Sequence, residues 1–131
     1  MTRIRSIARS LRRLAPALLI VGAGASCFHA RRGPGVPPAI IHFTNESLDQ
    51  ATVYALAPGS AALRLGTVMA GRTESLVVPA DWASRGSLNI VARLLARSIV
   101  PQTGLVAISP GEEYEVTLPL DGRLLSFLPS R

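Results

Sequence analysis

The 131-residue sequence contains no lysine, since all 14 of its basic residues are arginines. Enzymes that form a Schiff base on lysine or hold phosphate with a P-loop lysine are therefore excluded. Cysteine occurs once, so no disulfide can form within the chain. Aromatic residues make up only 5% of the sequence, which disfavours a broad aromatic binding platform.

Positive charge is concentrated at the amino terminus. The formal net charge is +6, but residues 37–131 contain seven arginines against eight acids, a formal charge of −1. A nucleic-acid-binding surface is therefore not expected on that part of the chain. Five arginines stand in the first 13 residues: Arg3, Arg5, Arg9, Arg12 and Arg13.

A long hydrophobic run is also missing. Residues 14–25 form a 12-residue stretch without charge, whereas a membrane-spanning helix needs about 20 apolar residues. A basic start, a short apolar run and small residues after it are typical of a secretory signal. We therefore predict that residues 1–26 form a signal peptide with a helical apolar part, followed by an exported domain.

Cys27 directly follows the small residues Gly24, Ala25 and Ser26. This segment resembles the lipobox of bacterial lipoproteins, in which the cysteine is lipidated and becomes the mature amino terminus. Gly24 departs from the leucine that is usual in the lipobox. Ordinary cleavage after Ala25 is the alternative, and it would leave a free thiol that is unfavourable in an oxidising compartment. We expect lipidation of Cys27.

Residues 27–38 then carry the lipid anchor and a tether. Prolines, glycines and the pair Arg31–Arg32 fill this segment, and such a composition builds neither a helix nor a central strand. We expect a disordered tether here and a folded domain over residues 39–131.

Short alternating segments separated by turn residues fill the region from residue 39. The clearest is 113–120, where Tyr114, Val116, Leu118 and Leu120 are predicted to face inward. Segments 39–45, 50–56, 63–68, 73–78, 87–95, 105–108 and 123–128 are the other predicted strands, with 105–108 predicted to be buried. This pattern predicts an all-β fold, an antiparallel β-sandwich (immunoglobulin-like) of about seven to eight short strands.

Three local features refine this prediction. Pro110–Gly111 suits a type II turn, and Asp121–Gly122 suits a two-residue hairpin between the last two strands. Residues 81–85 predict one helical turn, capped by Asp81 and ended by Gly86.

Residues capable of chemistry are few. His29 and His42 have no evident partner at a useful spacing, so neither a catalytic nor a metal site is predicted. The acids Glu112, Glu113, Glu115 and Asp121 lack the spacing of a calcium loop and are interpreted as a solvated face. The Asn45–Ser47 segment matches a glycosylation acceptor, but a turn is the preferred interpretation.

Trp82 is the one possible ligand-contact residue. It could stack on a sugar or peptide together with Tyr54 and Tyr114, although packing in or beside the core is favoured for all three. No cofactor and no metal are expected.

Three segments, Ala51–Tyr54 after Asn45, Arg64–Val68 and Ser109–Glu112, resemble a group of short exported lipoproteins of high-GC bacteria. The resemblance implies a single immunoglobulin-like or transthyretin-like sandwich and an envelope location, and it implies no substrate. We therefore expect a noncatalytic lipoprotein, anchored to the membrane through Cys27, that binds an envelope protein or supports an assembly. The alternative is a secreted or anchored sandwich that binds a small ligand or carbohydrate.

Overall fold

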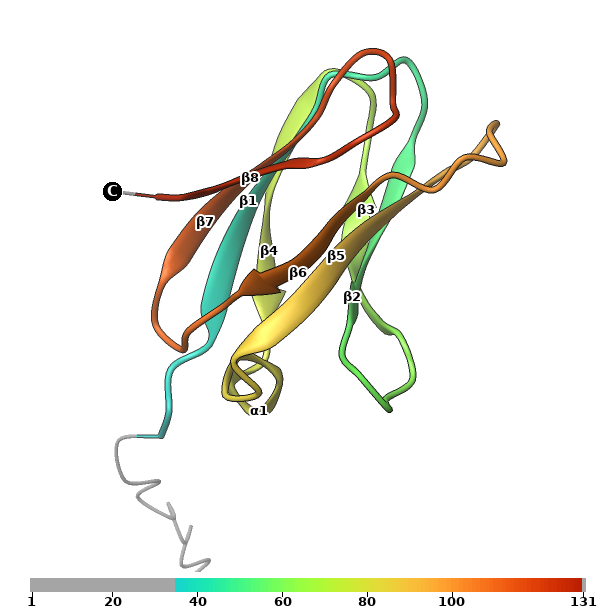
Figure 1. The fold of residues 1–131 in the computed structure, drawn as a ribbon. Coiled ribbons are helices and arrows are strands. Elements are labelled where there is room, and N and C mark those ends of the chain that lie inside the picture. The colour runs from blue at the N-terminus through green and yellow to red at the C-terminus, as the bar shows by residue number, and fades with distance from the viewer. Residues whose placement is uncertain (1–34, 131) are drawn as a thin grey trace, which may run out of the picture. The chain divides into compact units, whose positions relative to one another are not determined.

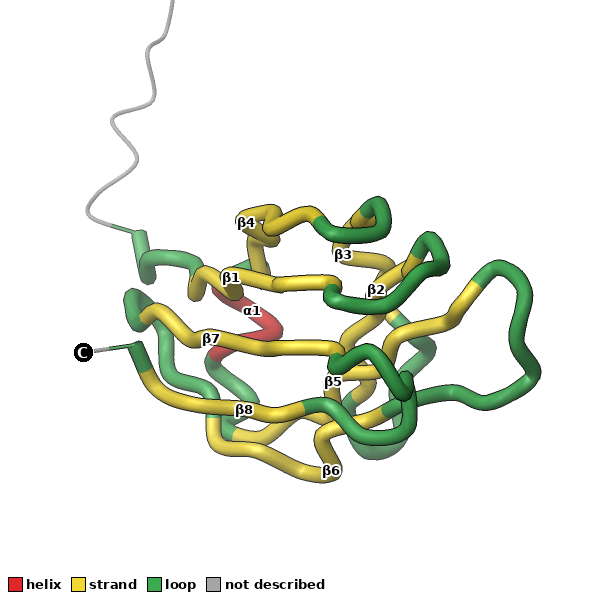
Figure 2. Tube along the Cα trace, turned by 90° about the horizontal axis from the view of Figure 1, so that it is seen from above, coloured by secondary structure: helices red, strands yellow, loops and turns green. Residues whose placement is uncertain are grey.

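The structure, a computed structural model, describes residues 35–130. It contains eight strands in two four-stranded sheets, with strand orders β4-β1-β7-β8 and β3-β2-β5-β6. We call these sheet 1 and sheet 2; they pack face to face as a sandwich (Figure 1, Figure 2). The strands are β1 (Ala39–Asn45), β2 (Ala51–Leu56), β3 (Leu63–Val68), β4 (Arg72–Val78), β5 (Ser87–Leu94), β6 (Gln102–Ala107), β7 (Glu113–Leu118) and β8 (Ser126–Pro129).

The core lies between the two sheets and is built by the inward positions of the alternating segments. Ile41, Phe43, Leu88, Ile90 and Val116 are each fully buried. Because side chains alternate across a strand, the intervening positions of β1, β2 and β5 point away from the other sheet. The predicted all-β sandwich and its inside-outside pattern are confirmed for these strands.

One pairing differs from the antiparallel prediction. β1 and β7 run parallel, with Ile41 opposite Tyr114 and Phe43 opposite Val116. Both strands begin at the end where the chain enters the sandwich. They are therefore joined by a long connection that includes β2 to β6, because a hairpin joins only antiparallel strands. The strand order also departs from the immunoglobulin topology, which places the first, second, fifth and fourth strands in one sheet.

The connection between β7 and β8 is longer than the predicted two-residue hairpin. It spans residues 119–125, and the Gly122 amide donates to the Pro119 carbonyl at 2.9 Å, so Gly122 closes a turn that begins at Pro119. Leu125 is buried, which draws the connection into the core and delays the start of β8. Leu120 lies in this loop and is exposed, against the prediction that it faces inward.

Two further predictions are corrected. Leu105 belongs to β6, an edge strand, and is exposed, so segment 105–108 is not a buried run; only its last residue, Ile108, is buried. The one-turn helix α1 (Ala80–Ala83) starts after Pro79 and has no side-chain cap, so Asp81 lies inside the helix and does not cap it.

The chain enters the sandwich beside the turn between β6 and β7. The Gly111 amide donates to the Pro38 carbonyl at 3.1 Å. A hydrogen bond of 3.3 Å from the Glu112 N–H to the Ser109 carbonyl closes the turn around Pro110 and Gly111. Gly111 has a φ of 79°, as the second central residue of a type II turn requires. The predicted turn is confirmed, and it marks what we call the entry end of the sandwich.

Candidate functional site

The end opposite the entry end is formed by the four connections β1–β2, β3–β4, β5–β6 and β7–β8 (Figure 1). They meet there because β1, β3, β5 and β7 all run toward this end and β2, β4, β6 and β8 return from it. We call these connections the distal loops: residues 46–50, 69–71, 95–101 and 119–125.

The distal loops carry a large share of the exposed apolar surface. Of the eleven large hydrophobic side chains exposed among residues 35–130, seven belong to these loops. Their exposed fractions lie between 48% and 79%: Leu48, Met69, Leu95, Ile99, Val100, Leu120 and Leu124. Scattered apolar side chains on a surface need no explanation, whereas a cluster at one end is typical of an interaction site.

A buried asparagine at the end of β1 fixes the β1–β2 loop to the end of β3. The Asn45 side-chain amide donates to the carbonyls of Asp49 at 2.8 Å and Val68 at 3.1 Å. Its carbonyl oxygen accepts from the Ser47 N–H at 3.0 Å and from the Ser47 hydroxyl at 2.7 Å. Asn45 is thus fully satisfied, and it ties the β1–β2 loop to the end of β3. The predicted turn at 45–47 is formed by the Asn45 side chain bonding the Ser47 N–H, whereas the Asn45 backbone is still part of β1.

Arg97 connects the remaining loops. Its Nε lies 2.8 Å from Oδ2 of Asp49 in the β1–β2 loop, and its guanidinium donates to the Asp121 carbonyl in the β7–β8 loop at 3.1 Å. The backbone adds two links, from Leu95 N–H to the Gln50 carbonyl at 3.0 Å and from Glu46 N–H to the Leu118 carbonyl at 2.9 Å. These bonds hold the loops in one arrangement, so their exposed side chains are presented from an ordered backbone.

Chemical groups for catalysis or metal binding are sparse at this end. Within residues 35–130 no cluster of three or more His, Cys, Asp or Glu side chains is arranged to hold a metal ion. Asp121 lies in the distal β7–β8 loop while Glu112 and Glu113 lie at the entry end, so the predicted acidic group is not brought together.

His42 does have partners, contrary to the expectation from the sequence. Its Nδ1 lies 3.0 Å from Oγ of Ser75 on β4, and its Nε2 lies 2.9 Å from Oε2 of Glu113 on β7. Ser75 lies directly opposite His42 on β4. On β7 the residue directly opposite His42 is Glu115, and Glu113 precedes it by two positions. Both are outward positions of predicted strands, but only the strand order tells which strands are neighbours.

Serine, histidine and glutamate are the residue types of a hydrolytic triad, so the surroundings decide what this set can do. A hollow of about 320 Å³ adjoins Glu113 and is lined by Gly111, Glu112, Glu113 and Ser130. Neither Ser75 nor His42 lines it, so the nucleophile of such a triad would not face the space beside the acid. We interpret the three residues as a hydrogen-bonded chain across sheet 1.

The three aromatic residues considered from the sequence lie in different surroundings. Tyr114 is buried, accepts the Ser109 N–H at 2.8 Å and stacks on Phe127 at 5.1 Å between ring centroids. Tyr54 lies on the outer face of sheet 2. Trp82 is half-buried on α1, packs against the core and carries the Arg85 guanidinium 4.5 Å above its ring. The structure does not bring them together as one stacking platform.

Cys27, the predicted lipidation site, and the predicted signal peptide lie outside the described residues. No helix among residues 35–130 has the length and apolar character needed to cross a membrane.

No protein-family model matches the sequence, and neither does any curated protein. A solution structure of a protein from Eubacterium rectale resembles the chain with a TM-score of 0.48 and 9% identity, covering 76% of this chain and 96% of that one. A crystal structure from Bacteroides ovatus ATCC 8483, of a protein named as a candidate cell adhesion protein, gives a TM-score of 0.39 and 12% identity. That match covers 72% of this chain and 43% of the other.

Proposed function

We propose that this protein is a noncatalytic recognition module of the bacterial cell envelope. In this proposal lipid on Cys27 anchors the chain to the membrane, and the distal loops bind a partner protein of the envelope. The observation that carries the binding role is the group of seven exposed apolar side chains on those loops.

The way in which the loops are fixed supports a binding role. Arg97 joins its own β5–β6 loop to the β1–β2 and β7–β8 loops through one ion pair and one hydrogen bond, and Asn45 orders the β1–β2 loop. The β3–β4 loop is tied by its backbone, because Gly71 N–H donates to the Asn45 carbonyl at 2.7 Å. Rigid loops lose little conformational entropy when they bind, so a larger part of the contact energy remains as affinity. Loops on a rigid sandwich are also the usual carriers of recognition in β-proteins.

The position of the loops supports the anchored arrangement. The chain enters at Pro38, beside Gly111, at the end of the sandwich opposite the distal loops. A lipid on Cys27 would therefore attach the domain by its entry end, with 11 residues between Cys27 and Ala39. Such a tether reaches at most about 40 Å when extended. The distal loops would then point away from the anchoring membrane, toward other envelope proteins.

The test is co-purification of a partner from membranes in mild detergent, using the full chain expressed in its own host. Leu48→Glu combined with Leu124→Glu places two charges in the distal loops. Leu128→Glu is the matched control, because Leu128 is similarly exposed (60%) but lies on β8. We expect the double variant to reduce recovery of the partner at least tenfold, and the control to retain it.

Two outcomes would contradict the proposal. One is equal loss of the partner in the double variant and the control. The other is a protein that is recovered alone and whose melting temperature rises with added saccharide, which would favour the ligand-binding alternative. That alternative is the weaker one because Arg85 already occupies the ring of Trp82.

A further inference from the structure

The two sheets differ in the sign of the charges on their strands. β2, β3, β5 and β6, which form sheet 2, contain Arg64 and Arg93 and no acidic residue. The strands of sheet 1 contain three glutamates and Arg72. A ligand or partner of negative charge is therefore favoured on sheet 2 and disfavoured on the strands of sheet 1.

Apolar side chains accompany the arginines on the outer face of sheet 2. Tyr54 of β2 stands between Arg64 of β3 and Val91 of β5 in the strand register. Beside Tyr54 is an open hollow of about 280 Å³. Its lining consists of Tyr54, Leu56, Ala62, Val91, Arg93 and Val100, and we call this surface the Tyr54–Arg93 face.

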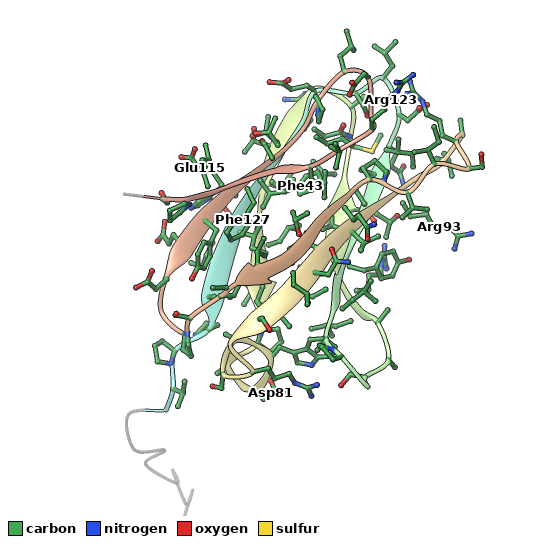
Figure 3. All side chains as sticks on the ribbon, in the orientation of Figure 1. Phe43, Asp81, Arg93, Glu115, Arg123 and Phe127 are labelled. Carbon is green, nitrogen blue, oxygen red and sulfur yellow. The ribbon has the colours of Figure 1, made fainter. Side chains whose placement is uncertain are left out.

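Arg93 is the unpaired cation of this face. Its side chain is exposed, and no hydrogen bond or ion pair joins it to another side chain among the residues described. Arg64, by contrast, donates to the Thr67 hydroxyl at 2.8 Å. Figure 3 shows Arg93 projecting from its strand beyond the ribbon. A guanidinium at the rim of an apolar hollow suits a ligand in which a carboxylate lies next to an apolar group. Two coplanar N–H donors of the guanidinium can bind the two oxygens of one carboxylate.

We propose that the Tyr54–Arg93 face binds a peptide segment of a partner protein, which places an apolar side chain in the hollow and a carboxylate on Arg93. The inference rests on the proposed recognition function and adds to it a partner chemistry and a second surface, which adjoins the distal loops at Val100. A segment of a larger protein fits better than a free small molecule, since the hollow is open whereas small-molecule sites enclose most of their ligand. Tyrosine and arginine are also the residues that most often dominate the energy of protein interfaces.

The carboxylate can come from an aspartate or glutamate side chain or from the carboxyl terminus of the partner. Two random heptapeptide libraries separate these sources, one displayed with free carboxyl termini and one displayed within a loop. The full chain in detergent is the bait, and a fluorescein-labelled peptide selected from each library is then measured by fluorescence anisotropy.

We expect the selected peptides to combine a carboxylate with a large apolar residue. Arg93→Glu should weaken the binding of these peptides at least tenfold, and Tyr54→Ser should weaken it as well. Arg72→Glu is the matched control, because Arg72 is also exposed but lies on β4 in sheet 1, and it should leave the affinity within twofold. Equal melting temperatures of Arg93→Glu and the original chain would show that the fold is intact.

Selection of peptides without acidic groups, or equal affinity for the Arg93→Glu variant, would overturn the inference. So would self-association of the chain that both Arg93→Glu and Glu115→Arg abolish, because a second copy would then occupy the face. A Leu48→Glu and Leu124→Glu variant that loses the envelope partner but still binds the peptides separates this inference from the proposed role of the distal loops.

Discussion

Asn45 and Ser47 are the two polar side chains that are buried among residues 35–130, and they lie two positions apart at the end of β1. Both are hydrogen-bonded, as buried polar groups must be to offset the loss of water. Asn45 fills every donor and acceptor position of its amide with a bond to the β1–β2 loop or to Val68. At the scale of single residues, the order of the β1–β2 loop and its link to the end of β3 therefore depend on this one side chain.

Asn45→Ala should lower the free energy of unfolding by about 3 kcal/mol, because it leaves buried partners such as the Val68 carbonyl without a hydrogen bond. Urea denaturation followed by circular dichroism measures this change. Asn89→Ala is the matched control, since Asn89 makes one side-chain bond, to Gln102, and its carbonyl oxygen has no partner. It should cost less than about 1 kcal/mol. Similar losses in both variants would mean that Asn45 does not organise the loops.

At the scale of elements, β7 alternates regularly between buried and more exposed positions. Tyr114, Val116 and Leu118 are buried, while Glu113 and Glu115 are exposed on the other side. β7 is also a central strand of sheet 1, with β1 on one side and β8 on the other. A change on its inward side therefore affects the packing of both sheets, and a change on its outward side affects mainly solvent.

Val116→Asp should unfold the domain, because a buried carboxylate without a partner costs several kcal/mol, roughly the stability of a small domain. Glu115→Ala, one residue away on the exposed side, should change the free energy of unfolding by less than about 0.5 kcal/mol. Thermal denaturation of both variants provides the comparison. Equal effects from the two substitutions would refute the assignment of faces on β7.

At the scale of the whole molecule, the two ends of the sandwich have different tasks in the proposed function. The entry end receives the chain at Pro38, and the distal end carries the ordered apolar loops. The arrangement depends on an anchor before residue 38, for which the sequence around Cys27 is the basis.

Cys27→Ser should move the protein from the membrane fraction to the soluble exported fraction, because the lipid is the proposed anchor. Cell fractionation with immunoblotting measures the distribution, and mass spectrometry of the original protein identifies its first residue. Ser26→Ala is the control, since a small residue before the cysteine is retained. An unmodified chain that begins at Ser26 would contradict lipidation.

Much of this protein was determined by its sequence alone. Alternation of apolar and polar residues in β1, β5 and β7 is a local property with a period of two, so it predicts both the strands and their buried faces without knowledge of neighbours. The Pro110–Gly111 turn was predictable for a similar reason, since the backbone preferences of two adjacent residues define it.

Tertiary structure decided which strands are neighbours, and that information is not contained in a local pattern. The parallel pairing of β1 with β7 brings Glu113 to His42 across 71 positions of sequence. The predicted Asp121–Gly122 hairpin is wrong because β7 and β8 are joined by residues 119–125, with Gly122 closing a turn from Pro119 and Leu125 buried. The division of eight strands between two sheets also gathers the distal loops at one end and leaves the strands of sheet 2 without acidic residues, since that division sets which residues share a surface.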